Sequence, residues 1–338
     1  MIYHQDDGFH MFVEFSLILL GVLLVWIVIS FRGWKRDLLK ALNEGSKIAS
    51  TSMGEIEYAL IGSGPVLLML HGGPGGYDQG LLDVEMWTKE GFSLLAISRP
   101  GYLRTPLSTG ETFEEQADAI EALLDALGIS KVAILGASAG GPVALHFALR
   151  HPDRIWALIL MAAVSKEYIV NQDQLNSTLG RILMSNSVAD FGIWLYDILT
   201  RRATAWSLKE ALKETMILDS KGKDDYVRQV MDIPEQVAWY KRFIRTTCPM
   251  SPRMAGLNND LNQLEQVSFT SLGAIKCPTL VIHGTADGDV SYANAEFSFS
   301  SIPNARLCSL ENIGHLVWLG EHVSKMNSDI LGFLRECV

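Results

Sequence analysis

The chain has 338 residues, enough for one large domain with an insertion, and it carries a formal net charge of −10. Lys and Arg (28) are fewer than Asp and Glu (38) and form no basic stripe, so we do not expect nucleic acid as a partner. The four cysteines are scattered without metal-ligand spacing, which predicts free thiols and no metal site.

The N-terminal segment is apolar enough to cross a membrane. Residues 15–31 carry no charge, and as a helix they would span about 25 Å, close to the ~30 Å core of a bilayer. A secretory signal would begin with basic residues, whereas Asp6, Asp7 and Glu14 make this one acidic. A buried core helix would be less uniformly apolar. Basic residues follow the run and none precedes it: Arg32, Lys35, Arg36 and Lys40.

This pattern predicts a single-pass anchor in residues 1–36. By the positive-inside rule, the rest of the chain is expected on the cytoplasmic side of the lipid bilayer. Residues 37–51 are expected to form a juxtamembrane helix and linker.

Strand patterns begin after this linker. Residues 55–61 alternate weakly between polar and apolar side chains and end at a Gly-Ser-Gly-Pro turn. Residues 66–70 form a continuous apolar run, as expected for a strand covered on both faces of a parallel sheet. Residues 92–98 are predicted as the next strand. Thr112 and Glu115 then form a capping-box pattern, which predicts the start of a helix that stops at Gly128.

A glycine-rich loop, His71-Gly72-Gly73-Pro74-Gly75-Gly76, follows the run at residues 66–70. A phosphate-binding loop would end in Gly-Lys-Ser or Gly-Lys-Thr, which this loop does not. Beside a nucleophile, the N–H of Gly73 would join that of Ala139 as an oxyanion hole. We expect His71 to order the loop rather than perform chemistry.

Residues 132–141 (VAILGASAGG) organise the chain around Ser138. They read as a buried strand, a tight turn and the start of a helix, with Pro142 tolerated in its first turn. The turn would hold Ser138 in a strained backbone conformation at the carboxyl edge of the sheet. Gly136 and Gly140 are expected to be small because strand and helix cross closely there.

Residues 165–265 interrupt the alternation of strands and helices. They read as amphipathic helices with equal numbers of acidic and basic residues. Several large side chains suggest a lid with an apolar inner face: Trp194, Tyr196, Trp206, Trp239, Tyr240, Met184, Met216 and Met231.

The last two predicted strands, residues 279–283 and 306–310, are each followed by a polar residue of interest. Asp287 follows the first and His315 the second, so Ser138, Asp287 and His315 occur in the order Ser, Asp, His. A serine hydroxyl needs a histidine to accept its proton, and a carboxylate to orient that histidine. Asp289 is the rival carboxylate, and we interpret His283 as structural.

These motifs together resemble the α/β-hydrolase superfamily from about residue 51 to the C-terminus. The matching pieces are His71 to Gly75, Arg99-Pro100-Gly101-Tyr102, Gly136 to Gly140, Gly284 to Asp287 with Val290, and Gly314-His315. The resemblance implies an α/β fold with an eight-stranded, mostly parallel sheet and a helical cap after the sixth strand. The core would comprise residues 52–164 and 266–338, and the cap residues 165–265.

Within that superfamily, the epoxide hydrolases and haloalkane dehalogenases use an aspartate where this chain has Ser138. The glycine loop resembles that of proline iminopeptidases, but the cap lacks their Trp-x-x-Trp-Glu element. An anchor with a serine triad resembles membrane-bound monoacylglycerol lipases, although Ala139 stands where many of these have methionine.

The sequence therefore predicts a membrane-anchored serine hydrolase of carboxylic esters, with a lipid-like ester as substrate and no metal or organic cofactor. An aminopeptidase and a carbon–carbon bond hydrolase remain as enzymatic alternatives. A catalytically silent membrane-bound sensor is the alternative of another class.

Overall fold

One eight-stranded sheet forms the centre of the computed structural model, which describes residues 6–169, 185 and 188–338. Its strands are β1 (Lys47–Thr51), β2 (Gly54–Gly62), β3 (Val66–Leu70), β4 (Ser93–Ile97), β5 (Val132–Ala137), β6 (Ile155–Met161), β7 (Thr279–Gly284) and β8 (Ala305–Leu310). Their order is β1-β2-β4-β3-β5-β6-β7-β8. The β1–β2 and β2–β4 pairs are antiparallel and the others are parallel. The predicted α/β-hydrolase fold is thus confirmed.

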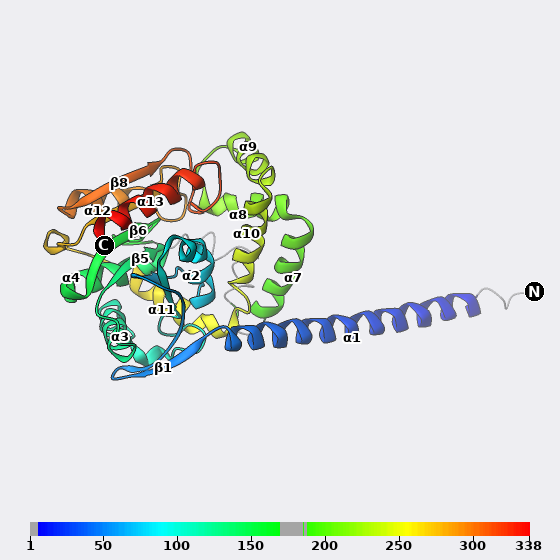
Figure 1. The fold of residues 1–338 in the computed structure, drawn as a ribbon. Helices are drawn as coiled ribbons and strands as arrows, with labels where there is room; N and C mark the ends of the chain where they lie inside the picture. The colour runs from blue at the N-terminus through cyan, green and yellow to red at the C-terminus, as the bar shows by residue number, and fades with distance from the viewer. Residues whose placement is uncertain (1–5, 170–184, 186–187) are drawn as a thin grey trace, which may run out of the picture.

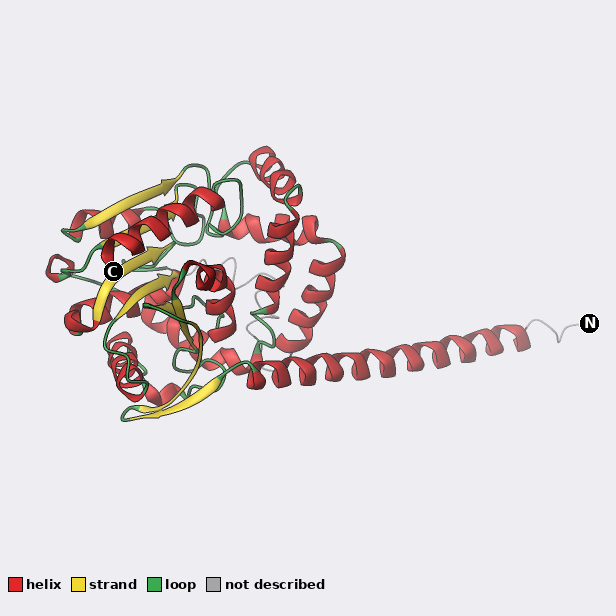
Figure 2. Cartoon of the chain, viewed as in Figure 1, coloured by secondary structure: helices red, strands yellow, loops and turns green. Residues whose placement is uncertain are grey.

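Helices cover both faces of the sheet (Figures 1 and 2). The helices of the core are α2 (Tyr77–Val84), α3 (Phe113–Ala126), α4 (Gly141–Arg150), α12 (Ala293–Ser301) and α13 (Val323–Cys337). Side chains alternate along β3: Leu68 and Leu70 share a buried cluster with α3, α4 and α12, while Leu67 and Met69 share one with α13. The continuous apolar runs of the central strands follow from this cover on both sides.

The start of α3 follows its predicted capping pattern. Thr112 Oγ1 accepts the backbone N–H of Glu115, and the Glu115 carboxylate accepts the N–H of Thr112. Gly128, just beyond the helix, has φ +66°, a conformation that side chains other than glycine rarely adopt.

The N-terminal helix is longer than the sequence indicated. Helix α1 runs from Asp6 to Glu44 and projects away from the globular domain (Figure 1). From Phe9 it is long and apolar enough to cross a membrane, by length and composition. Part of residues 37–51 is helical, as expected, but this helix continues α1 without a break as far as Glu44, and residues 47–51 form strand β1 where a linker was expected. Leu38 and Leu42 pack on the domain and keep the chain helical, and β1 then pairs with β2 as the edge strand.

The helical cap lies between β6 and β7. Its described helices are α7 (Ala189–Arg202), α8 (Thr204–Thr215), α9 (Ser220–Met231), α10 (Pro234–Arg245) and α11 (Met254–Leu264). Figure 2 shows α7 to α10 gathered on the side of the domain from which α1 projects. Trp194, Met216 and Tyr240 are buried as expected, whereas Trp206 is exposed. Met184 lies outside the described residues.

Candidate active site

Ser138 lies in the sharp turn between β5 and α4. It opens a single turn of 3-10 helix, and its φ of +49° is in the left-handed region that non-glycine residues rarely occupy. Neighbouring glycines make the turn possible. A Cβ on Gly136 would lie 2.7 Å from the Cβ of Ala144, and one on Gly140 would collide with the carbonyl of Leu70. The close crossing expected from the sequence is therefore present.

The three residues predicted as a triad come together at the carboxyl edge of the sheet. Nε2 of His315 lies 3.1 Å from Oγ of Ser138, and Nδ1 lies 2.9 Å from Oδ2 of Asp287. Asp287 follows β7 and His315 follows β8, and the carboxyl ends of these parallel strands meet at one edge. A continuous hydrogen-bond chain thus joins Ser138 to Asp287.

The Asp287 carboxylate has a partner for each oxygen. Oδ1 accepts the backbone N–H groups of Asp289 and Val290, both at 2.9 Å. Oδ2 lies 3.2 Å from Nε2 of His283 in addition to its contact with His315. Burial alone would raise the pKa of Asp287, but the two histidines outweigh it, so the pKa is lowered and the carboxylate stays ionised. His283, which we interpret as structural, thus contacts the Asp287 carboxylate directly.

Asp289 lies on the opposite side of the imidazole from Asp287. Its Oδ2 is 3.5 Å from Nε2 of His315, and its Oδ1 accepts the hydroxyl of Tyr168 at 2.6 Å. Burial alone would lower the pKa of His315, yet Asp287 and then Asp289 raise it to about 9. The contact of Asp289 with Nε2 and the role of Tyr168 have no signal in the sequence, because Tyr168 lies at the start of the cap, 121 positions before Asp289.

The glycine loop passes directly against the nucleophile. A Cβ on Gly72 would lie 2.9 Å from that of Ser138, so Gly72 is the residue that permits this approach. The N–H groups of Gly73 and Ala139 have no hydrogen-bond partner among the described residues. His71 is fully buried and orders the loop: its Nε2 accepts the N–H of Arg99, and its Nδ1 donates to the carbonyl of Gly72. Burial, and next the charge of Arg99, lowers its pKa and keeps it neutral.

Two buried arginines connect this loop to the end of the cap. Arg99 donates to the carbonyl of His71 at 3.0 Å and forms a paired hydrogen bond with Asp260 of α11. Arg253 donates to the carbonyl of Gly75 at 2.6 Å and pairs with Asp78 at the start of α2. Both guanidinium groups are fully buried, and each is neutralised by a carboxylate.

The other side of the site is held by the segment that links α8 to α9. The carbonyl of Thr215 accepts the backbone N–H of His315 at 2.7 Å and that of Gly288 at 3.3 Å. Met216 forms an isolated β-bridge with Asp287. The loops that carry the acid and the histidine are therefore both tied to the cap.

Comparison with known proteins gives the family of this chain. The sequence profile of the alpha/beta hydrolase fold family matches residues 65–321. The chain belongs to this family. An uncharacterized hydrolase of Bacillus subtilis is 31% identical over 83% of this chain and 95% of that protein. The solved structure of an alpha/beta hydrolase fold protein from Nakamurella multipartita is 31% identical, with a TM-score of 0.74 over 86% of this chain and 99% of that chain.

A further relative of this α/β hydrolase carries a substrate in its name. The 2-hydroxy-6-oxononadienedioate/2-hydroxy-6-oxononatrienedioate hydrolase 1 of Dechloromonas aromatica is 28% identical over 83% of this chain and 90% of that protein.

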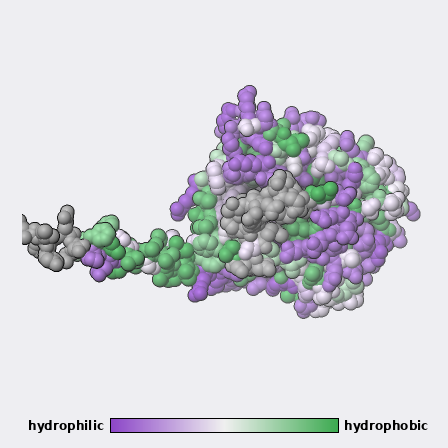
Figure 3. Space-filling model, turned by 180° about the vertical axis from the view of Figure 1, so that it is seen from behind, coloured by the Kyte–Doolittle hydropathy of each residue, from purple (hydrophilic) through white to green (hydrophobic). Residues whose placement is uncertain are grey.

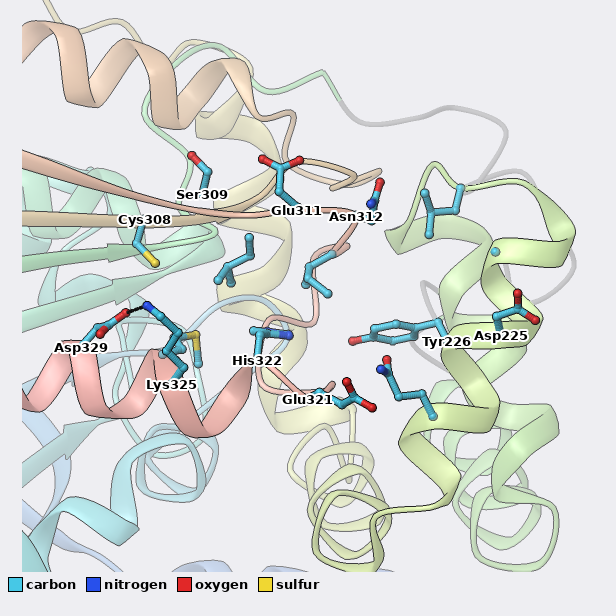
Figure 4. Close-up of a pocket in the computed structure, with 16 residues that line it drawn as sticks. Asp225, Tyr226, Cys308, Ser309, Glu311, Asn312, Glu321, His322, Lys325 and Asp329 are labelled. Carbon is cyan, nitrogen blue, oxygen red and sulfur yellow. Dashed lines mark hydrogen bonds and ion pairs between the residues drawn. The ribbon is translucent and has the colours of Figure 1, made fainter.

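A cavity of about 640 Å³ lies outside the triad of this α/β hydrolase, between α9 and the segment from β8 to α13 (Figure 4). Its described lining does not include Ser138, Asp287 or His315. Asp329 and Lys325 pair with each other on its floor. Among the described residues, no group of three or more His, Cys, Asp or Glu side chains is placed to hold a metal ion.

Proposed function

We propose that this protein is a membrane-anchored serine hydrolase that cleaves neutral carboxylic esters, of a lipid-like kind such as monoacylglycerols. The observation that carries the proposal is the hydrogen-bond chain from Ser138 through His315 to Asp287. A serine hydroxyl alone is a weak nucleophile, and this arrangement is the one that activates it.

In the proposed reaction, Oγ of Ser138 attacks the ester carbonyl while Nε2 of His315 takes its proton. Asp287 holds the Nδ1 proton and stabilises the imidazolium that forms. His315 then gives the proton to the departing alcohol, which leaves the acyl group on Ser138. A water molecule deprotonated by His315 releases the acid and restores the enzyme.

The N–H groups of Gly73 and Ala139 are proposed to bind the oxyanion. Their lack of a partner among the described residues supports this role, because donors free of other bonds are available as charge develops on the substrate. The close approach of Gly72 to Ser138 brings the glycine loop near enough to the reacting carbon.

Charge around the site favours a neutral substrate. The described charged side chains in contact with His315 are two carboxylates, Asp287 and Asp289. The buried cations nearby, Arg99 and Arg253, are already paired with carboxylates. An anionic substrate would meet repulsion here without a free described cation to offset it.

Helix α1 is proposed to anchor this hydrolase in a bilayer, with the catalytic domain on the cytoplasmic side. Its apolar window is entirely exposed, unlike a core helix of a soluble protein. Its C-terminal part packs on the domain through Leu38 and Leu42, so removal as a signal sequence would strip the domain of a packed element. The cations after the apolar run, which include Arg36 and Lys40, support the orientation.

A carbon–carbon bond hydrolase is the second candidate, favoured by the similarity to the relative from Dechloromonas aromatica. The substrate in that relative's name is a dioate, which carries carboxylates. The charge around His315 disfavours such a substrate for this chain.

The test is turnover of the full chain in detergent on three matched substrate sets. These are a p-nitrophenyl ester and monoacylglycerol series of rising acyl length, proline and alanine arylamides, and a 2-hydroxy-6-oxodienoate. We expect kcat/KM to rise with acyl length, by up to roughly a hundredfold from four to eight carbons if every added CH₂ is buried. Faster cleavage of the dienoate or of the arylamides would replace the ester proposal, and a flat acyl profile would remove its lipid part. Failure to react with a serine-directed phosphonate would favour a non-catalytic sensor.

A further inference from the structure

Helix α7 of the cap has an exposed apolar stripe. Its outward side chains recur every three or four residues along one helical face: Val188, Phe191, Leu195 and Leu199, each 37% to 45% exposed. The opposite face is buried, and its Ala189 and Ile193 lie in an apolar cluster with Leu38 of α1. A helix with one buried face on a water-exposed surface normally shows polar residues outward, and α7 does not.

Other helices of the same domain follow the ordinary rule. The exposed residues of α13 are polar or glycine, as at Lys325, Asp329 and Glu336. The exposed face of α9 carries Lys221, Asp225 and Arg228. The stripe on α7 is therefore a local feature and not a property of the whole surface.

Helix α7 lies against α1 at the end of the apolar run of α1. The ring of Phe31, the last residue of the charge-free run of α1, lies 5.6 Å from that of Phe191 and 5.7 Å from that of Trp194. In the view of Figure 1, α7 runs across the direction of α1, on the side to which α1 projects. Figure 3 shows apolar residues along α1 and at the adjoining edge of the domain. The stripe thus lies at the level where the apolar run of α1 ends.

Polar contacts fix α7 at this level. Nε1 of Trp34 donates to Asp197 at 3.0 Å, and Nζ of Lys35 pairs with Asp190 at 2.5 Å. Both carboxylates belong to the inward face of α7, and both are buried. Two successive residues of α1, Trp34 and Lys35, therefore bind α7, and this limits how far the stripe can move relative to α1.

Exposed cations lie on α1 beyond Phe31 and at the end of α7. They are Arg36, Lys40, Arg201 and Arg202, of which the first three also pair with Asp37, Glu44 and Asp197. Apolar side chains flanked by basic ones match the surface of a bilayer with anionic headgroups. If α1 spans a bilayer, the end of its apolar run lies at the bilayer surface, so lipid is the occupant next to the stripe.

We propose that the outer face of α7 is a second membrane-contact surface, which lies in the headgroup and upper acyl region of the same bilayer that α1 spans. This inference rests on the proposed anchoring by α1. It means that the cap is held flat on the lipid surface and does not hang from a flexible tether.

The experiment places a fluorescent nitrobenzoxadiazole label at single accessible cysteines of the full chain, with the half-buried Cys308 and Cys337 changed to Ser and the buried Cys248 and Cys277 kept. The test position is Leu195→Cys, and the matched control is Phe299→Cys, an equally exposed apolar position on α12 (43% against 44%). Val22→Cys reports α1 itself. The protein is reconstituted in vesicles of phosphatidylcholine and phosphatidylglycerol, with and without doxyl-labelled lipid as quencher. Circular dichroism checks that each variant is folded.

We expect doxyl lipid to quench the label at position 195 and at position 22 and to leave position 299 unchanged. If position 22 is quenched and position 195 behaves like position 299, the contact of α7 with lipid is overturned while the anchor stands. If position 22 is not quenched, the anchor and this inference both fall. The quenching does not depend on which substrate the enzyme cleaves, so a wrong ester proposal would leave the result unchanged.

Discussion

The backbone carbonyl of Thr215 accepts the N–H of His315 at 2.7 Å, so a residue of the cap holds the histidine that contacts Ser138. The same carbonyl binds Gly288 in the acid loop. A main-chain bond of this kind does not depend on the identity of the side chain at position 215. The cap therefore supports the site through a backbone carbonyl, and the type of residue at position 215 gives no sign of this contact.

Replacement of the nucleophile tests the centre of the proposal. Ser138→Ala should lower kcat on the order of 10⁶-fold, because only binding and oxyanion effects would remain. The measurement is ester turnover together with circular dichroism, which should be unchanged. Retention of more than a few per cent of activity would remove Ser138 from its role.

Replacement of the two carboxylates beside His315 should lower kcat by very different factors. Asp287→Asn should lower kcat by ~10⁴-fold, because an amide would no longer hold the correct tautomer of the imidazole at Nδ1. Asp289→Asn should lower kcat only slightly at high pH, because Oδ2 of Asp289 lies 3.5 Å from Nε2 of His315 and does not hold the Nδ1 proton. The reverse ranking of the two variants would make Asp289 the catalytic acid.

The pH profile should report the charges around His315. Its pKa is raised to about 9, and only neutral His315 can accept the serine proton, so kcat/KM should rise with pH through that region and level off above it. Asp289→Asn removes one of the charges that raise the pKa, so the rise should move to lower pH. Asp225→Asn, which removes an exposed charge on α9, should leave the profile in place. Equal profiles for all three proteins would show that Asp289 does not act on His315.

Asp83 should make stability depend on pH. It is buried in α2, its Oδ1 has no hydrogen-bond partner among the described residues, and burial raises its pKa well above 3.8. The folded state therefore binds this proton more tightly than the unfolded chain. The stability that results is fully present below about pH 4 and is lost as pH rises toward the folded-state pKa.

Asp83→Asn should consequently stabilise the protein at pH 8 and have a smaller effect at pH 5. The measurement is the urea midpoint in detergent at both pH values. Asp153→Asn, an exposed position, is the control and should change neither midpoint. A destabilised Asp83→Asn variant at pH 8 would show that the ionised carboxylate has a favourable partner.

The end of α1 should belong to the folded domain. A chain that begins at residue 31 keeps Trp34, Leu38 and Leu42, whereas one that begins at Ser46 loses all three. Leu38 and Leu42 are 5% and 8% exposed, and burial of each contributes about 2 kcal/mol. The shorter chain should therefore melt at a lower temperature in a thermal scan. Equal melting temperatures would show that this contact adds nothing to stability.

Much of the fold was predictable because local patterns and chain order were both clear. Parallel strands with continuous apolar runs place their carboxyl ends at one edge, so the loops with Ser138, Asp287 and His315 had to meet there. Edge strand β1 was missed because its side chains are mostly exposed and polar. The packing of residues 37–44 on the domain was not predicted, because the partners of Leu38 and Leu42 come from distant parts of the chain.

The surroundings of the triad could not be predicted for a related reason. The pairs Tyr168–Asp289 and Arg99–Asp260 join residues that lie 121 and 161 positions apart in the sequence, and only the fold brings them together. Charged residues at such positions look like ordinary surface residues in a single sequence. The structure shows that Asp260 is buried and neutralises an arginine.

The ties between cap and core limit how a substrate can enter. At one end Thr215 binds the histidine and acid loops. At the other end Arg253 binds the glycine loop directly, and Asp260 binds it through Arg99. A hinge motion of the whole cap would break these contacts and separate the loops that align Ser138, so the open form would be inactive. We therefore expect the cap to keep these contacts during turnover, with substrate and products passing without a movement of the whole cap.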